Sequence, residues 1–181
     1  IDWSWQDHIS GKTDNETARL TAQTLAWVLS STKRSLRDQT TKALVNLLQE
    51  QPNALLKVLS AFEGIDDLYI LERLYAVAYG CALRTTKTES LRQIAQYVLT
   101  NVFLKNPPDH VLLRDYAKST VEYAVHQGIE LIGDINRIRP PYRSNMPEAI
   151  PDEEQLKAYK LDYNSPDFKK GNGRMQNKIS F

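Results

Sequence analysis

Apolar side chains recur at intervals of three and four residues through most of this 181-residue chain. Residues with this spacing lie on one face of an α-helix, so the pattern predicts helices. Prolines and glycines separate the runs, as is typical of helix starts and ends. The predicted helices cover about residues 14–30, 35–51, 53–62, 68–83, 86–105 and 109–127. We therefore expect an all-α protein.

The first and last of these helices illustrate which faces we expect to be buried. In the first helix, which Asp14 would cap, the apolar positions are Leu20, Thr24, Trp27, Val28 and Leu29. In the last, they are Val111 or Leu112, Tyr116, Ala117, Val121 and Ala124. Thr86 or Thr88 is expected to cap the fifth helix and Asp109 to start the sixth. Gly128 has the position of a residue that ends a helix.

The segment from Leu68 to Leu83 is apolar on nearly every side. A helix of this kind buries all of its faces, so it belongs in the middle of a helical stack with neighbours on both sides. Gly80 suggests that another helix approaches it closely. Asp66 and Asp67 precede the segment as candidates for its N-cap.

A short phrase recurs at the start of three predicted helices. Its copies are Leu36-Arg37-Asp38-Gln39-Thr40-Thr41-Lys42-Ala43-Leu44, Ile70-Leu71-Glu72-Arg73-Leu74-Tyr75-Ala76-Val77 and Leu113-Arg114-Asp115-Tyr116-Ala117-Lys118-Ser119-Thr120-Val121. Aligning Arg37 with Leu71 and Arg114 gives separations of 34 and 43 residues, within the range of two-helix structural repeats. The sequence therefore predicts about three antiparallel helix pairs in a right-handed stack.

These phrases resemble HEAT and armadillo-type repeats, and the resemblance covers roughly residues 15–127. It implies an α-α superhelix, although Leu71 stands where the pattern usually has a basic residue. The stretches 36–45, 69–80 and 163–168 also resemble helical regions of large bacterial P-loop NTPases of the signal-transducing, antiphage-defence kind. That resemblance implies a fragment of such a protein whose phosphate-binding loop lies elsewhere, since no Walker motif occurs here.

The composition changes after residue 127, because five of the eight prolines lie at Pro140, Pro141, Pro147, Pro151 and Pro166. We expect an N-terminal segment at 1–13, a helical-repeat domain at 14–127 and a proline-rich extension at 128–181. The extension would act as a spacer or dock on the array or on missing domains. A short helix is predicted within 151–159, where acidic residues follow Pro151.

The overall composition is typical of a soluble globular protein, with 41% hydrophobic residues, 25% charged residues and a net charge of +1. No apolar run approaches the roughly 20 residues needed to cross a bilayer. The lone cysteine, Cys81, excludes an internal disulfide, as is typical of the cytoplasm. Because the chain begins at Ile1 without a basic and apolar leader, we expect a cytoplasmic fragment of a larger bacterial protein.

The residue types offer little catalytic chemistry. Three scattered histidines and one cysteine lack the spacing of a zinc site, and no nucleophile motif occurs, so we expect no metal, no cofactor and no enzymatic activity in this fragment. Acidic residues stand in the first turns of predicted helices, where carboxylates cap backbone N–H groups. These residues are Asp38, Asp66, Asp67, Glu72 and Asp115. Arg37 and Arg114 are expected to bridge neighbouring repeats through such carboxylates.

Six tyrosines gather in the predicted helices, at Tyr69, Tyr75, Tyr79, Tyr97, Tyr116 and Tyr123. Tyrosines interleaved with arginines can stack the bases of single-stranded nucleic acid. However, Tyr75 and Tyr79 lie four residues apart on the most apolar helix. Core packing is therefore the favoured interpretation.

The best candidate for a contact site lies in the extension. Arg137, Arg139, Tyr142 and Arg143 stand on a proline-stiffened strand and suit phosphate or an acidic partner. The plain alternative is a linker with solvated arginines. We expect a scaffold that binds a partner protein or other domains of its parent chain, and no membrane.

A second function stays open, namely a nucleic-acid-binding array with a basic groove. Clustering of six basic residues on one face, together with binding that weakens steeply with salt, would favour it. These residues are Lys42, Arg73, Arg84, Arg92, Arg114 and Lys118. The near-zero net charge favours the protein scaffold.

Overall fold

The computed structural model describes residues 13–142 and 151–157, and within these ranges no strand occurs. Its elements are α1 (Asn15–Val28), α2 (Arg34–Leu48), α3 (Pro52–Phe62), α4 (Leu68–Arg84), α5 (Thr88–Val98), the π-helical η2 (Leu99–Phe103), α6 (Val111–His126), the 3-10 helix η3 (Ile135–Ile138) and α7 (Glu153–Lys157). The prediction of an all-α protein is confirmed for the described residues. The expected N-terminal segment, apart from its last residue, lies outside them, as do Arg143 and the stretch 163–168.

The chain divides into two compact units, residues 1–144 and 145–181. The described part of the second unit is α7, within the segment where a short helix is predicted. Asp152 Oδ1 accepts a hydrogen bond from Gln155 N, and Gln155 Oε1 accepts one from Asp152 N. This reciprocal pair satisfies N–H groups that a helix start leaves open. All other elements belong to the first unit.

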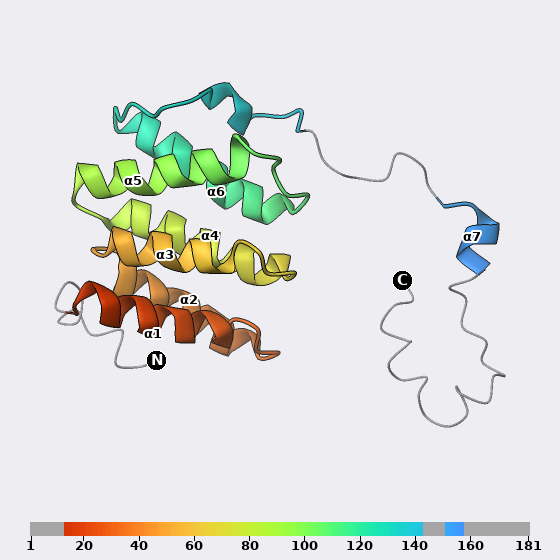
Figure 1. Ribbon diagram of the computed structural model, residues 1–181, viewed down its shortest axis with the longest axis horizontal. Coiled ribbons are helices and arrows are strands. Elements are labelled where there is room, and N and C mark those ends of the chain that lie inside the picture. Colours follow the sequence, from red (N-terminus) through yellow and green to blue (C-terminus); the bar gives the residue numbers. More distant parts are fainter. Residues whose placement is uncertain (1–12, 143–150, 158–181) are drawn as a thin grey trace. The chain divides into compact units, whose positions relative to one another are not determined.

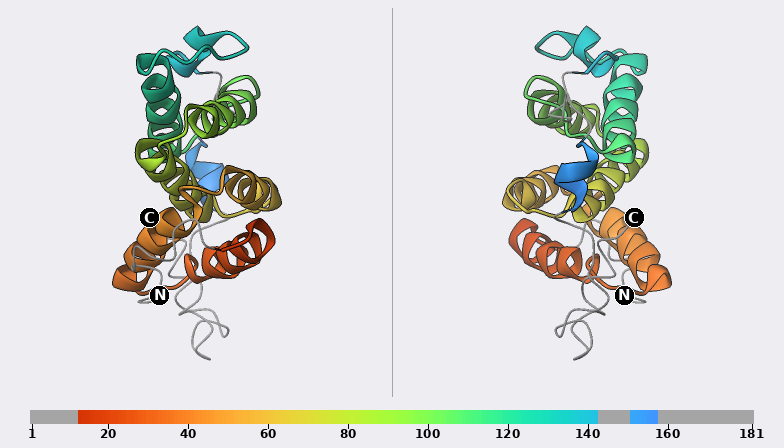
Figure 2. Two further views of the ribbon diagram at one scale, coloured as in Figure 1. Left: turned by 90° about the vertical axis from the view of Figure 1, so that its left-hand side faces the viewer. Right: turned by 90° about the vertical axis from the view of Figure 1, so that its right-hand side faces the viewer.

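The helices α1 to α6 form two layers (Figure 1). Along one layer α1 contacts α3 and α3 contacts α5, and along the other α2 contacts α4 and α4 contacts α6. The pairs α1/α2, α3/α4 and α5/α6 pack between the layers. The side views of Figure 2 show the layers as two columns of helices.

The helix α4 lies at the centre of this arrangement, as its apolar sequence predicts. It contacts α2, α3, α5 and α6, and Leu74, Val77, Ala78 and Cys81 are fully buried. At Gly80, an added Cβ atom would lie 2.7 Å from Cγ2 of Val45 in α2. The close helix approach expected at this glycine is confirmed.

The buried face of α1 differs from the prediction, although Leu29, at the C-cap, is fully buried as predicted. Ala18, Ala22 and Ala26 are fully buried, whereas Leu20 and Trp27 are 51% and 57% exposed. Both sets have helical spacing, so periodicity alone does not distinguish them. The small alanines allow α1 to pack closely against α2 and α3, and the larger side chains stay at the surface.

The start of α6 also differs from the prediction, because Leu113 is buried there while Val111 and Leu112 are exposed. His110, rather than Asp109, caps this helix, since its Nδ1 atom accepts a hydrogen bond from Leu113 N at 3.3 Å. The buried position lies one residue later than predicted. Because neighbouring helix residues point in different directions, Leu113 then faces the core while Val111 and Leu112 face solvent.

The other helix ends test the capping predictions. Asp14 and Asp67 cap α1 and α4 through their carboxylates, as predicted. The N-cap of α5 is Lys87, without a side-chain hydrogen bond, so the prediction of Thr86 or Thr88 is wrong. Gly128 adopts φ +76°, a conformation that suits glycine at a helix C-terminus, and the predicted stop is confirmed.

Residues 128–142 cover the last helix pair. Ile129 and Ile138 are buried in the same hydrophobic core as the six helices, and η3 contacts η2. The extension expected from residue 128 therefore begins as part of the packed unit. This packing fixes the backbone on which the predicted contact residues stand.

Candidate functional site

Arg137 holds the extension on the helical stack. Its Nη1 and Nη2 atoms donate hydrogen bonds to the carbonyl oxygens of Leu104 and Lys105, each at 3.3 Å. These carbonyls follow the end of η2, where a helix leaves acceptors without intrahelical partners and favours positive charge. Arg137 is thus engaged within the protein.

Tyr142 closes the end of the described segment. Its hydroxyl donates to the carbonyl oxygen of Ile138 at 2.6 Å. Its ring lies 6.2 Å from the ring of Phe103 and 4.8 Å from the guanidinium carbon of Arg114. Tyr142 therefore joins the extension to η2 and α6 by ring packing and a cation-π contact.

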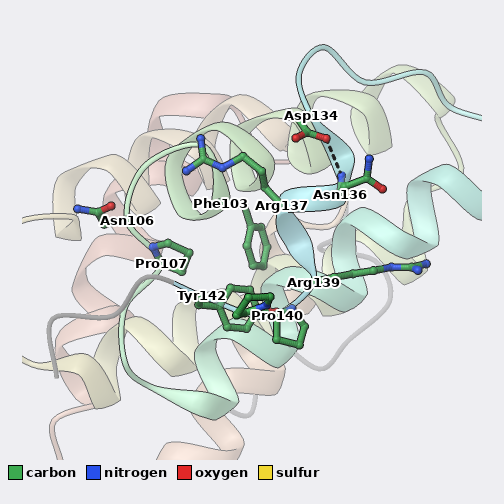
Figure 3. A pocket seen from close by; sticks show the side chains of 10 residues that line it. Phe103, Asn106, Pro107, Asp134, Asn136, Arg137, Arg139, Pro140 and Tyr142 are labelled. Carbon is green, nitrogen blue, oxygen red and sulfur yellow. Dashed lines mark hydrogen bonds between the residues drawn. The ribbon is translucent and has the colours of Figure 1, made fainter. Parts of the chain in front are cut away.

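Arg139 differs from both neighbours. It is exposed, and its side chain makes no hydrogen bond or ion pair with any described residue. Arg137 and Arg139 extend in opposite directions from the segment (Figure 3). The structure thus does not bring these two arginines together on one ligand, and Arg143 lies outside the described residues.

A cavity of about 570 Å³ opens between this segment and the turn after η2 (Figure 3). Its apolar lining comes from Phe103, Pro107, Pro140, Pro141 and Tyr142. Its polar lining comes from Asn106, Asp134, Asn136, Arg137 and Arg139. Arg139 also borders a second cavity of about 280 Å³ beside α6. This mixture suits an extended peptide, with proline and aromatic surfaces for apolar groups and an exposed guanidinium for an anion.

Sequence reasoning identified the extension side of this cavity and missed the other side. Phe103, Asn106 and Pro107 lie more than 30 residues before Tyr142 in the chain. The Asn106-Pro107-Pro108 stretch follows the predicted helix at 86–105, and nothing in the local sequence connects it with the arginines. The contact between η2 and η3 creates the site.

A second arginine cluster joins α2 to α4. The Tyr69 hydroxyl oxygen accepts hydrogen bonds from Arg37 Nε and Arg73 Nη2, both at 2.8 Å. Arg73 Nη1 donates to Asp38 Oδ1 at 3.0 Å. Arg37 also donates to the Ser31 carbonyl oxygen at 2.7 Å. Both guanidiniums therefore find their acceptors inside the protein.

Arg37 and Arg114 do not follow the prediction that they bridge repeats through carboxylates. Arg37 bridges to a tyrosine and a carbonyl, Arg114 stacks on Tyr142, and neither pairs with a carboxylate of the described residues. Asp38 forms ion pairs with Arg34 and Arg73 rather than a cap. The carboxylate link between α2 and α4 is therefore made by Arg73.

Glu72 also departs from its expected capping role. Its side chain is buried, and its Oε2 atom lies 3.6 Å from His110 Nε2. Within residues 13–142 and 151–157, no group of three or more His, Cys, Asp or Glu residues is placed to hold a metal ion. Burial raises the pKa of the Cys81 thiol far above its ordinary value, which keeps it protonated and a poor nucleophile.

Comparison with known proteins gives no relative. No protein-family model matches the chain, and no curated protein and no solved structure matches it. None of the helices in the described part of the chain is long and apolar enough to cross a membrane.

Proposed function

We propose that this chain is a helical-repeat scaffold of the HEAT or armadillo kind that binds a partner protein, or other domains of its parent chain. The observation that carries the proposal is the 570 Å³ cavity at the end of the stack, with Arg139 exposed at its border and without an acceptor among the described residues. Such arrays function by offering surfaces to partners.

The placement of the recurring phrase supports the repeat part of this proposal. Arg37, Leu71 and Arg114 all lie in the first or second turn of α2, α4 and α6, which follow one another in one layer. Equivalent positions thus recur in equivalent helices. The NTPase parent rests on the sequence resemblance alone.

The partner we propose is a protein segment that carries a carboxylate next to apolar residues. A guanidinium binds a carboxylate through two parallel hydrogen bonds, and no described residue engages the donors of Arg139. The rings of Phe103, Pro140 and Tyr142 supply apolar contact area beside it. Tyr142 and Arg137 fix the shape of the site, so the segment would bind a preformed surface.

The distribution of basic residues favours a protein partner over nucleic acid. Arg92 belongs to α5, in the opposite layer from α2, α4 and α6, which carry the other five residues considered for a basic groove. Carboxylates lie beside three of the six, in the pairs Arg73–Asp38, Arg92–Glu89 and Lys118–Glu122. A groove that neutralises phosphates needs basic side chains that are gathered and unpaired.

Selection of displayed random peptides on the intact chain tests the proposal. We expect enrichment of sequences that combine Asp or Glu with apolar residues. Their binding should be lost in Arg139→Ala and retained in Arg34→Ala, which removes an exposed arginine elsewhere on the stack. Peptides that bind both variants equally would contradict the site.

Binding of fluorescent single-stranded and double-stranded DNA and RNA across a salt series tests the competing function. We expect no binding at low salt. Binding that falls steeply with salt and is lost in an Arg137/Arg139/Arg143→Ala variant would replace the protein scaffold with the nucleic-acid function.

A further inference from the structure

The 3-10 helix η3 lies between the two cavities that Arg139 borders. A 3-10 helix has three residues per turn, so side chains three residues apart lie along the same edge. Asn136 and Arg139, the residue that follows the helix, line both cavities. Ile135 and Ile138, also three residues apart, line the second cavity. Asn136 and Arg139 therefore form a ridge with a cavity on each side.

The first cavity, of about 570 Å³, offers flat ring surfaces (Figure 3). Phe103, Pro140 and Tyr142 line it, and the Phe103 and Tyr142 rings lie 6.2 Å apart in a tilted arrangement. Aromatic rings prefer tilted or offset contacts with one another. This cavity therefore suits an aromatic side chain of a bound segment.

The second cavity, of about 280 Å³, lies beside α6 and is smaller. Its apolar lining comes from Val125, Ile135 and Ile138, and its polar lining includes Glu122 and His126. Cavities that hold a whole small ligand begin at about 300 Å³, so this one suits a single side chain. Its branched aliphatic lining favours an aliphatic side chain over an aromatic one.

The charges differ between the ridge and the two cavities. The first cavity contains Asp134, which accepts a hydrogen bond from Asn136 N at 3.0 Å. The second contains Glu122, whose ion pair with Lys118 at 3.8 Å is partly exposed and therefore weak. On the ridge, Arg139 has no acceptor among the described residues. A partner carboxylate is thus favoured on the ridge and repelled from either cavity.

We propose that the partner segment crosses this ridge in an extended conformation. Its carboxylate binds Arg139, an aromatic side chain enters the first cavity and an aliphatic side chain enters the second. In an extended chain, every second side chain points to the same side. The segment therefore has its acidic residue in the centre, with an aromatic residue two positions to one side and an aliphatic residue two positions to the other. This inference rests on the proposed function, because it specifies what the same site binds.

Selection from short displayed peptides with a fixed central Asp and random flanks tests this motif. On the wild-type chain, we expect Phe, Tyr or Trp two positions to one side of the Asp and Leu, Ile or Val two positions to the other. Val125→Trp fills the second cavity and should abolish the aliphatic preference while the aromatic one remains. As a matched control, Val111→Trp changes an exposed apolar residue of the same helix and should select as wild type does. Arg139→Ala should bind few of the selected peptides.

Fluorescence anisotropy with a selected peptide measures the aliphatic contact. Exchanging the aliphatic residue of the peptide for Ala should weaken binding to the wild-type chain by about tenfold, as expected for a buried aliphatic side chain. The same exchange should have little effect on Val125→Trp, because the cavity is then occupied. Such non-additivity is the mark of a direct contact.

Glu122→Gln tests why the carboxylate belongs on the ridge. A peptide that carries a second Asp in place of its aliphatic residue should bind the wild-type chain more weakly than the Ala peptide does, because Glu122 repels it. Glu122→Gln should remove that difference. A difference of the same size in both chains would contradict the assigned place of the second cavity.

The outcomes separate this inference from the proposed function. Peptides that depend on Arg139 but show no preference at the two flanking positions would overturn the motif and leave the proposed function intact. No enrichment on the wild-type chain would contradict both. If Val125→Trp does not fold, as judged by its circular dichroism, the Ala exchange in the peptide still decides. Unchanged affinity of the wild-type chain for the Ala peptide would overturn the motif.

Discussion

The two arginine clusters of this protein use the same side chain in opposite ways. Between α2 and α4, Arg37 and Arg73 converge on the Tyr69 hydroxyl and find every major acceptor inside the protein. At the end of the stack, Arg137 binds two main-chain carbonyls, while Arg139 finds no described acceptor. The first cluster joins helix pairs, and the second leaves one guanidinium without an acceptor among the described residues.

The difference arises from the elements that face each arginine. Two helix starts meet at Tyr69 and bring a hydroxyl, a carboxylate and a carbonyl together. The last pair has no further helix pair behind it in the described unit, so the extension faces η2, the turn after it and α6 rather than the start of another helix. An arginine at an open end of a stack is therefore the better candidate for recognition.

The largest loss of stability is expected at Gly80, where α2 and α4 approach each other closely. Gly80→Val would drive its side chain into Val45, whose Cγ2 atom already lies 2.7 Å from the position of an added Cβ. Overpacking of this kind lowers the free energy of unfolding by about 2 kcal/mol or more. Urea denaturation would measure the loss.

Matched variants separate this clash from a general helix effect. Adding Val45→Ala to Gly80→Val should restore part of the lost stability, because it removes the opposing methyl groups. If Gly80→Val alone is as stable as wild type, the close approach of α2 and α4 is wrong.

The next largest loss of stability is expected in the cluster of Arg37, Arg73 and Tyr69 between α2 and α4. Tyr69→Phe removes the oxygen that accepts from Arg37 and Arg73 and leaves half-buried guanidinium donors without it. Hydrogen bonds to charged groups contribute about 1.5 kcal/mol or more, so thermal unfolding should shift downward. Tyr123→Phe, whose hydroxyl makes no hydrogen bond with a described residue, should leave the midpoint nearly unchanged.

At the end of the stack, Arg137 is predicted to stabilise the fold and Arg139 to bind the partner. Arg137→Ala loses two hydrogen bonds to carbonyls and should cost about 1 kcal/mol of unfolding free energy. Arg139→Ala should change it by less than about 0.5 kcal/mol, as for most exposed positions. Equal losses in chemical denaturation would contradict the division between them.

The smallest effect is a decline of stability at alkaline pH. Burial and the hydrogen bond to Glu63 raise the pKa of Tyr97 above its usual range, and burial also raises the pKa of Tyr75. A tyrosine that binds its proton more tightly in the folded state contributes stability below the unfolded pKa of about 10, and this is lost as the pH rises further. Unfolding midpoints should fall above that pH, and less steeply in Tyr97→Phe. The same slope in both chains would show that Tyr97 does not contribute.

The positions of the helices could be predicted from the sequence, because periodicity, prolines, glycines and capping aspartates act locally. Asp14, Asp67 and Gly128 all occupy the places expected of them. The buried face of α1 could not be predicted, since the alanines and the larger Leu20 and Trp27 both follow a helical period. The neighbouring helices, rather than α1 itself, decide between the two.

The candidate site was predictable only in part. The extension could be predicted as a contact site because its arginines and prolines are adjacent in sequence. The division of labour between Arg137 and Arg139 depends on Leu104 and Lys105, and the cavity depends on Phe103. These partners come from a segment more than 30 residues earlier, and local sequence contains no signal of that contact.

Titration calorimetry with a selected acidic peptide tests the central claim most directly, using wild type, Arg139→Ala and Arg34→Ala. Loss of one charged hydrogen-bonded pair should weaken binding to Arg139→Ala by about tenfold or more, while Arg34→Ala binds as wild type does. Equal affinities for all three chains would contradict the claim that the open end of the stack is the recognition site.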